Sequence, residues 1–202
     1  MNQAKVQFSS SEMELMRNSE IILTKNKVLG KVKTLLEELQ NNLTENNQYH
    51  SDTLSTEIFS IHPKISKGEN YLGLPYLILD YPRLFKQQDI FATRTMFWWG
   101  NFYSTTLHLS GEYKLKYLRK IQSAQNLLSR ENFSIGINED PWLHDFTHDN
   151  YRLISSLNEE EFKNLCEEQQ HLKIAKTIDL NNDDANQKLM ENWQLLAKIC
   201  FG

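Results

Sequence analysis

The chain has 202 residues and a formal net charge of −4. This length is typical of a single domain, which buries about 70% of the surface that its unfolded chain exposes. Its two cysteines, Cys166 and Cys200, are too few for a disulfide framework and favour a reducing, cytoplasmic compartment. No run of eighteen apolar residues is present, and the first thirty residues mix acidic, basic and polar groups, so neither a membrane span nor a signal peptide is expected.

Helical patterns dominate the N-terminal part of the chain. Ser11 and Glu14 have the spacing of a capping box, which predicts the start of a helix. Over residues 24–43 apolar side chains recur at steps of three and four, which predicts an amphipathic helix. A polar loop is expected over residues 44–53.

Short apolar runs bounded by turn residues follow this helix. Residues 56–61 have a strand pattern, residues 66–70 read as a turn, and residues 76–81 read as a second strand. Pro75 and Pro82 flank the second strand. Because proline cannot donate a hydrogen bond to a neighbouring strand, we expect either that this strand lies at an edge of the sheet or that the proline marks the start of the strand.

The centre of the predicted sheet is a hairpin over residues 90–110. Gly100 and Asn101 separate two β-prone runs, and Gly-Asn is typical of a two-residue type II′ turn. This turn sets the register of the hairpin, in which Trp99 pairs with Phe102.

The predicted register also assigns side chains to the two faces of the hairpin. Because neighbouring side chains in a strand alternate, Arg94, Trp98 and Leu107 are expected on one face, and Trp99 and His108 on the other. Both faces carry large aromatic residues, each of which removes about 150–250 Å² from water when buried. Both faces therefore need a cover from helices, a second subunit or a ligand.

The C-terminal half combines helices with short strands. The predicted elements are a helix over 112–130, a strand over 133–137, a loop with a short helix after Pro141 over 138–151, a helix over 158–170, a last strand over 172–180 and a helix over 183–199 capped by Asn182 and Asp183.

These elements predict one α+β domain with a twisted, mostly antiparallel sheet built around the hairpin and covered by amphipathic helices. The covering helices are those over 24–43, 112–130 and 183–199. Along the chain, the domain divides into an N-terminal helical segment (11–43), a sheet core (56–137) and a C-terminal helix–strand–helix segment (158–200).

One cluster has the spacing of metal ligands. If residues 144–148 form a helix, His144 and His148 share one face, and Asp145 takes the place of the general base in the H-E-x-x-H pattern of zinc proteases. This cluster supports a hypothesis of a metal-dependent hydrolase, although aspartate is one methylene shorter than glutamate. The alternative is a solvent-exposed helix that binds no metal.

The order of elements offers another hypothesis. The αβββαβ order over residues 24–137, with Asp80 upstream of Glu112 and Lys114, resembles the core of PD-(D/E)xK nucleases. The resemblance implies a nucleic-acid enzyme or binder in which the carboxylates of Asp80 and Glu112 meet around Mg²⁺ beside Lys114. Those families place the E-x-K triplet on a strand, whereas here it falls at a predicted helix start. The negative net charge also argues against nucleic acid as a partner.

The first choice is a non-catalytic protein that binds a small ligand or a protein partner through an aromatic sheet surface. No phosphate-binding loop, nucleophile elbow or zinc-ribbon spacing is present, and no cofactor is predicted. An exposed aromatic surface would also permit a homo-oligomer. The candidate ligand-binding residues are Asp80, Arg94, Trp98, Trp99 and His108.

Arg94 is the most informative of these residues. Arginine stays charged, so burying it without a partner costs several kcal/mol. We expect either an ion pair with Asp80 on the preceding strand or an anionic ligand, and the ion pair is preferred.

Overall fold

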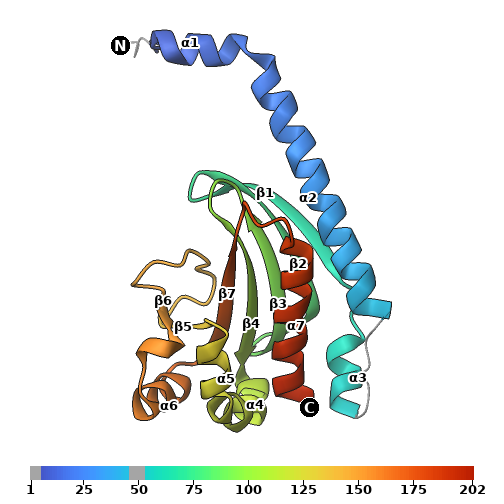
Figure 1. Ribbon diagram of the computed structural model, residues 1–202, viewed down its shortest axis with the longest axis vertical. Helices are drawn as coiled ribbons and strands as arrows, with labels where there is room; N and C mark the ends of the chain where they lie inside the picture. Colours follow the sequence, from blue (N-terminus) through green and yellow to red (C-terminus); the bar gives the residue numbers. More distant parts are fainter. Residues whose placement is uncertain (1–5, 46–52) are drawn as a thin grey trace.

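The computed structural model describes residues 6–45 and 53–202, which form an α+β domain around one antiparallel sheet of seven strands (Figure 1). The strands lie in the order β1-β2-β3-β4-β7-β5-β6. Their bounds are β1 Lys64–Tyr71, β2 Leu74–Lys86, β3 Asp89–Trp98, β4 Phe102–Ser110, β5 Ser134–Gly136, β6 Tyr151–Leu153 and β7 His171–Asp179. The predicted fold class is confirmed.

The helices precede, interrupt and follow the strands. Their bounds are α1 Ser10–Arg17, α2 Ser19–Glu45, α3 Thr53–Phe59, α4 Gly111–Ser123, α5 Gln125–Arg130, the 3₁₀ turn η1 Ile154–Ser156, α6 Glu159–Glu168 and α7 Ala185–Phe201. Within the described ranges, no helix is both long and apolar enough to cross a bilayer. Both cysteines are buried free thiols.

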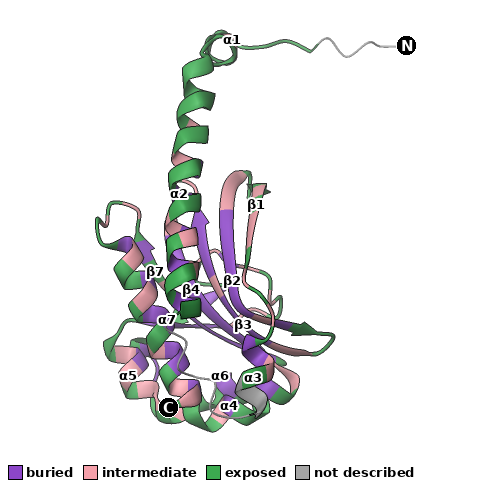
Figure 2. Cartoon of the chain, turned by 90° about the vertical axis from the view of Figure 1, so that its right-hand side faces the viewer, coloured by how far each residue is buried: buried purple, intermediate pink, exposed green. Residues whose placement is uncertain are grey.

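One face of the sheet carries the main hydrophobic core. Phe91, Leu107 and Leu109 from the central hairpin lie there with Leu36 of α2 and Trp193 of α7. Strands β2, β3, β4 and β7 are buried along most of their length, whereas the edge strand β1 is not (Figure 2). Helices α2, α4 and α7 cover this face, as predicted for residues 24–43, 112–130 and 183–199.

The predicted hairpin is present as β3 and β4, but its register is wrong by one residue. Trp98, not Trp99, pairs with Phe102, and the turn is closed by a hydrogen bond from the Asn101 amide to the Trp98 carbonyl. Gly100, with φ +72°, takes the third position of this turn, whereas the type II′ prediction placed it second. A slip of one residue exchanges the faces of a whole strand, so Arg94 and His108 lie on the same face.

Three predictions for the N-terminal part are also wrong. The capping box is formed by Ser9 and Glu12, two residues before the predicted one. Residues 53–59 form helix α3, where a strand was predicted over 56–61. The predicted turn over 66–70 belongs to strand β1. Most of the predicted loop over 44–53 lies outside the described residues.

The two prolines of β2 predicted an edge strand or a strand start; β2 is an interior strand, and Pro75 is its second residue. The ladder with β3 shifts register between Asp80 and Arg83, and Pro82 sits in this irregularity, where no ladder hydrogen bond is required. The predicted helix over 112–130 is divided at Ala124 into α4 and α5. The predicted last strand, β7, is confirmed and pairs with β4 near the centre of the sheet.

Candidate ligand-binding site

The face of the sheet opposite the main core carries a row of polar side chains. Asp80 of β2 is the cross-strand neighbour of Arg94 of β3, and Arg94 is the neighbour of Thr106 of β4. One step along the same strands, His108 of β4 is the neighbour of Lys173 of β7. All five residues are buried or half-buried. The loop over residues 137–150, between β5 and β6, reaches this face through hydrogen bonds to Arg94, Lys173 and Tyr71.

Arg94 connects two strands and this covering loop. Its Nε lies 2.8 Å from Asp80 Oδ1 and its Nη2 lies 2.9 Å from Asp80 Oδ2, so the pair is bidentate. Its Nη1 lies 2.9 Å from His144 Nε2. Since arginine only donates, His144 Nε2 accepts, and the ring is neutral. The predicted ion pair between Arg94 and Asp80 is confirmed.

The covering loop is held by two further polar anchors. The Tyr71 hydroxyl accepts hydrogen bonds from the backbone N–H groups of His144 (2.6 Å) and Asp145 (3.2 Å), and donates to Asp145 Oδ1 (3.0 Å). The Lys173 ammonium donates to the Leu143 carbonyl. These bonds place Trp142 beside His108, with 5.7 Å between ring centroids.

A cavity of about 500 Å³ opens where the covering loop meets the ends of β4 and β7. His108 and His171 form part of its wall, and each is only 6% exposed. Their ring centroids lie 5.8 Å apart. Neither Nε2 atom has a hydrogen-bond partner among the described residues. The other lining residues are Gln87, Gln88, Ile90, Ser110, Gly111, Glu139, Pro141, Trp142 and Gln170.

Both imidazoles are uncharged at neutral pH. Burial, followed by the charge of neighbouring Lys173, lowers the pKa of His171 to about 4. Burial lowers the pKa of His108 to about 3, with smaller effects from His171, Lys173 and Arg94. A hydrogen bond to the backbone of Asn138 raises the pKa of His171, as a carbonyl that accepts from the ring does. A neutral imidazole has one donor and one acceptor nitrogen, so the unpartnered Nε2 of each ring donates or accepts according to the tautomer.

The wall of the cavity opposite the covering loop is tightly built. Gly111 has φ +54°, and a Cβ at this position would lie 1.9 Å from Asp89 Oδ1. That oxygen instead accepts from the Glu112 amide at 2.8 Å. The Ser110 hydroxyl donates to the Gln88 carbonyl at 2.5 Å and accepts from the Ile90 amide. The cavity therefore lies between elements held together by hydrogen bonds.

A second cavity, of about 600 Å³, lies between β7 and α7. It is lined largely by charged side chains, including Lys176, Glu131 and Lys188. Lys176 and Glu131 lie 3.6 Å apart and are solvent-accessible. Buried Asn192 also lines it and has an unpartnered Nδ2. Five charged side chains line this cavity, whereas one, Glu139, lines the 500 Å³ cavity. Because charged side chains are strongly hydrated, the 500 Å³ cavity fits an uncharged ligand better.

Of the predicted ligand-binding residues, some line the cavity and others lie elsewhere. His108 lines the 500 Å³ cavity, whereas Asp80 and Arg94 form the ion pair beside it. Trp98 belongs to a small hydrophobic cluster with Ile78 and Met96.

The expected exposed aromatic surface is largely covered. Trp98 is 7% exposed, and Trp99 at the turn packs against the main core. Phe102 is half-buried and contacts Phe146 of the covering loop, with 5.2 Å between ring centroids. The hairpin aromatics are therefore a poor surface for homo-oligomers.

The geometry behind the metal hypothesis is wrong. Residues 144–148 are not helical, so His144 and His148 do not share a helix face. His144 is buried against Arg94, while His148 is exposed. Asp145 accepts hydrogen bonds from Tyr71 and Asn150. Across residues 6–45 and 53–202, no group of three His, Cys, Asp or Glu side chains is arranged to hold a metal ion.

The nuclease-like arrangement is also absent. Glu112 and Lys114 lie in helix α4, and the buried Lys114 ammonium donates to the backbone carbonyls of Glu167 and Gln169. Asp80 is bound to Arg94 on the face of the sheet that α4 does not cover.

Sequence reasoning missed His171, Trp142 and Glu139. His171 and Lys173 alternate with Leu172 and Ile174, which marks a strand with one polar face, but the predicted strand began one residue too late to include His171. No local signal places Trp142 beside His108. Comparisons of the chain with protein families, with curated proteins and with solved structures found no match.

Proposed function

We propose that the protein binds a small, uncharged molecule in the cavity lined by His108, Trp142 and His171. The observation that carries this proposal is that His108 and His171, which both line the cavity, each have a buried Nε2 atom without a hydrogen-bond partner. Most buried polar atoms in proteins are hydrogen-bonded, and leaving one unsatisfied costs about 1–3 kcal/mol. A ligand that supplies a hydrogen-bonding group recovers this free energy.

The lining of the cavity defines the chemical class of the ligand. The unpartnered Nε2 atoms of His108 and His171 call for a ligand with a polar O or N atom that forms a hydrogen bond with the ring. Trp142 and Ile90 provide an aromatic and an aliphatic surface for a planar or apolar portion. The volume of about 500 Å³ falls within the ~300–1,000 Å³ of small-molecule sites.

The electrostatics favour an uncharged ligand over an ion. Burial is the largest cause of the lowered pKa of His108, and the nearby positive charges of Lys173 and Arg94 lower it further, which disfavours a cation at this ring. Glu139 lines the same cavity and disfavours an anion. The two neutral imidazoles supply hydrogen-bonding atoms without charge.

A fragment screen by ligand-observed NMR tests the proposal. The probes are uncharged heteroaromatic and alcohol fragments, presented to the wild type and to His171→Phe, Trp142→Ala and His148→Phe. We expect fragments that bind the wild type to bind His171→Phe and Trp142→Ala at least tenfold more weakly. His148→Phe is the matched control, because this exposed histidine lies on the same loop away from the cavity lining.

Two further measurements separate binding from a folding defect. His171→Gln retains a side-chain acceptor and is expected to recover part of the affinity. In ¹⁵N-labelled wild type, bound fragments should shift the Nε2 resonances of His108 and His171. Equal affinity of the fragments for wild type and a folded His171→Phe would refute the proposed site.

A further inference from the structure

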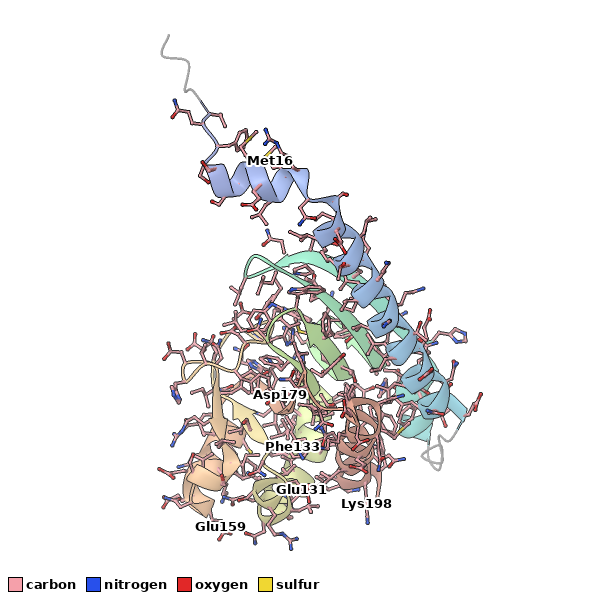
Figure 3. All side chains as sticks on the ribbon, turned by 45° about the horizontal axis from the view of Figure 1, so that its top comes forward. Met16, Glu131, Phe133, Glu159, Asp179 and Lys198 are labelled. Atoms are coloured by element: carbon pink, nitrogen blue, oxygen red, sulfur yellow. The ribbon has the colours of Figure 1, made fainter. Side chains whose placement is uncertain are left out.

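The cavity of about 600 Å³ between β7 and α7 lies on the opposite face of the sheet from the site described above. Ile178 of β7 belongs to the main core, whereas His171, an odd number of positions away on the same regular strand, lies on the other face. In Figure 3 Asp179 and Glu131, which both line the cavity, lie one above the other beside α7. The lining residues are Glu131, Lys176, Thr177, Ile178, Asp179, Asn182, Lys188, Glu191, Asn192 and Leu195.

Asn192 is a polar residue on the buried face of α7. It is 5% exposed and shares this face with Leu189, Trp193 and Leu196. Its Nδ2 has no hydrogen-bond partner among the described residues. Because buried polar atoms are normally hydrogen-bonded, this position calls for an acceptor, such as a carboxylate oxygen.

Thr105 of β4 is a second buried polar residue without a partner. It is fully buried, and its Oγ1 makes no hydrogen bond within the described ranges. Thr105 is the cross-strand neighbour of Lys176 and lies between Tyr103 and Leu107 on the core face of β4. Two unsatisfied polar atoms are therefore present here, one on α7 and one on the face of the sheet that α7 covers.

Lys176 supplies a positive charge to the same cavity. Its side chain is 24% exposed, and its ammonium lies 5.3 Å from the centre of the Phe133 ring. The ammonium is 3.6 Å from Glu131 Oε2, which is longer than a hydrogen bond. Since an ammonium has three N–H donors, Lys176 can bind a ligand carboxylate while it stays beside Glu131.

The exposed part of the cavity lining is acidic. Asp179 and Glu191 are exposed and form no ion pair in the described part of the chain, and Lys188 is the one exposed lysine of the lining. Asp179 Oδ1 accepts from the Asn181 amide at 2.7 Å. Glu191 Oε1 accepts from Gln187 at 2.8 Å, so each carboxylate keeps a second oxygen for a cationic group.

The cavity also has an apolar wall. Ile178 is 5% exposed, and Leu195 is partly buried against the main core. These two side chains offer a surface to the hydrocarbon part of a ligand. The volume of about 600 Å³ falls within the ~300–1,000 Å³ of small-molecule sites.

We infer that this cavity binds a small zwitterion, an α-amino acid with an apolar side chain. Its carboxylate accepts hydrogen bonds from Asn192 Nδ2 and the Lys176 ammonium. Its ammonium donates to Asp179 and Glu191, and its side chain packs on Ile178. The inference does not depend on the function proposed above, because the two cavities share no lining residue.

Isothermal titration calorimetry of the full chain with free L-amino acids that have apolar side chains tests the inference. At least one of them is expected to bind the wild type. Its N-acetyl derivative lacks the positive charge and its amide lacks the negative charge, so each should bind at least tenfold more weakly. A derivative that binds as tightly as the free amino acid would overturn the zwitterion.

Two variants assign the binding to this cavity. Asn192→Leu and Lys176→Met should each weaken binding at least tenfold. Asn192→Leu replaces an unsatisfied amide with an apolar side chain of similar size, so its melting temperature should not fall below that of the wild type. The matched controls are Asn164→Leu and Lys163→Met, two exposed residues of α6 outside the cavity, and both should bind like the wild type.

Two results would overturn the site. One is the absence of binding by every amino acid tested at millimolar concentration. The other is equal affinity of the wild type and the folded variants Asn192→Leu and Lys176→Met. His171→Phe should bind amino acids like the wild type, and a loss in this variant would instead assign them to the cavity on the other face.

Discussion

The guanidinium of Arg94 donates two parallel hydrogen bonds to the carboxylate of Asp80, at 2.8 Å and 2.9 Å. The two residues are cross-strand neighbours on β2 and β3. The remaining Nη1 donates to His144 in the covering loop, so one side chain connects the sheet to the loop that forms part of the cavity. Loss of the Arg94 side chain should therefore weaken both the contact between β2 and β3 and the attachment of the covering loop.

Arg94→Met should lower the free energy of unfolding by about 3 kcal/mol, as measured by urea denaturation. The substitution leaves the Asp80 carboxylate unpaired in a largely buried site, and removing one partner of a buried pair costs ~3–5 kcal/mol. The lower end applies because the side chains of Arg94 and Asp80 retain 17% and 11% exposure.

Two variants show whether this loss comes from the unpaired carboxylate. Asp80→Leu/Arg94→Met removes both charges and should lose less stability than Arg94→Met alone. Lys67→Met, which breaks an exposed ion pair with Glu69, should cost no more than about 1 kcal/mol. An Arg94→Met variant as stable as the wild type would contradict the structural role.

The buried histidines should make the protein acid-sensitive. The pKa of His108 is lowered to about 3 and that of His171 to about 4, whereas in the unfolded chain each binds a proton near 6.5. The unfolded state therefore holds more protons below pH 6.5. The free energy of unfolding should fall as the pH drops from 6.5 to 4.5, by up to about 1.4 kcal/mol per pH unit for each histidine.

Urea denaturation at several pH values between 4.5 and 7 measures this slope. His171→Phe should reduce it, because one of the buried histidines with a lowered pKa is removed, while His108 and His144 remain. The exposed His148→Phe should leave it unchanged. Equal slopes for His171→Phe and wild type would show that His171 takes up its proton in the folded state as readily as in the unfolded chain.

Lys173 should make the free energy of unfolding depend on pH in the alkaline range. Burial, and then the charge of Arg94, lower its pKa from 10.5 to about 7. Between these values the unfolded state holds the proton and the folded state does not, so the free energy of unfolding should rise with pH from 7 to 9.5. Lys173→Met should flatten this rise, and the exposed Lys163→Met should not. A rise that persists in Lys173→Met would assign it to another group.

Tyr71→Phe should loosen the covering loop. The substitution removes the acceptor for the backbone N–H groups of His144 and Asp145 but keeps the ring, which packs against Trp98 at 5.2 Å. We expect a loss of about 1–3 kcal/mol and faster hydrogen exchange at these two amides. Tyr76→Phe in the same aromatic cluster is the control, since its hydroxyl makes no hydrogen bond within the described part of the chain. Unchanged exchange in Tyr71→Phe would contradict its anchoring role.

Local patterns in the sequence were enough to predict the fold class, the three covering helices and the pairing of Arg94 with Asp80. The helices follow from apolar periodicity within one segment. The ion pair follows because Asp80 and Arg94 lie on consecutive antiparallel strands, and a charged arginine in a sheet requires a nearby partner. These features depend on interactions between residues close in sequence.

The hairpin register depends on more than the turn. In the observed register Phe91, Phe97 and Leu107 share the core face, while Arg94 and His108 share the polar face. In the register predicted from the Gly-Asn turn, each face of the hairpin carried residues from both of these groups. Burial of one apolar face outweighed the preference of a two-residue turn, because a slip of one residue would have turned every core side chain of one strand outward.

Only the tertiary structure decided where the candidate site lies. His108 and His171 meet because β7, a distant segment of the chain, pairs with β4, and alternation within one strand does not identify its neighbour in the sheet. Trp142 joins them because the covering loop is anchored at Tyr71, Arg94 and Lys173, residues of three other strands. The cavity thus depends on contacts whose partners are far apart in sequence, and no local periodicity encodes such contacts.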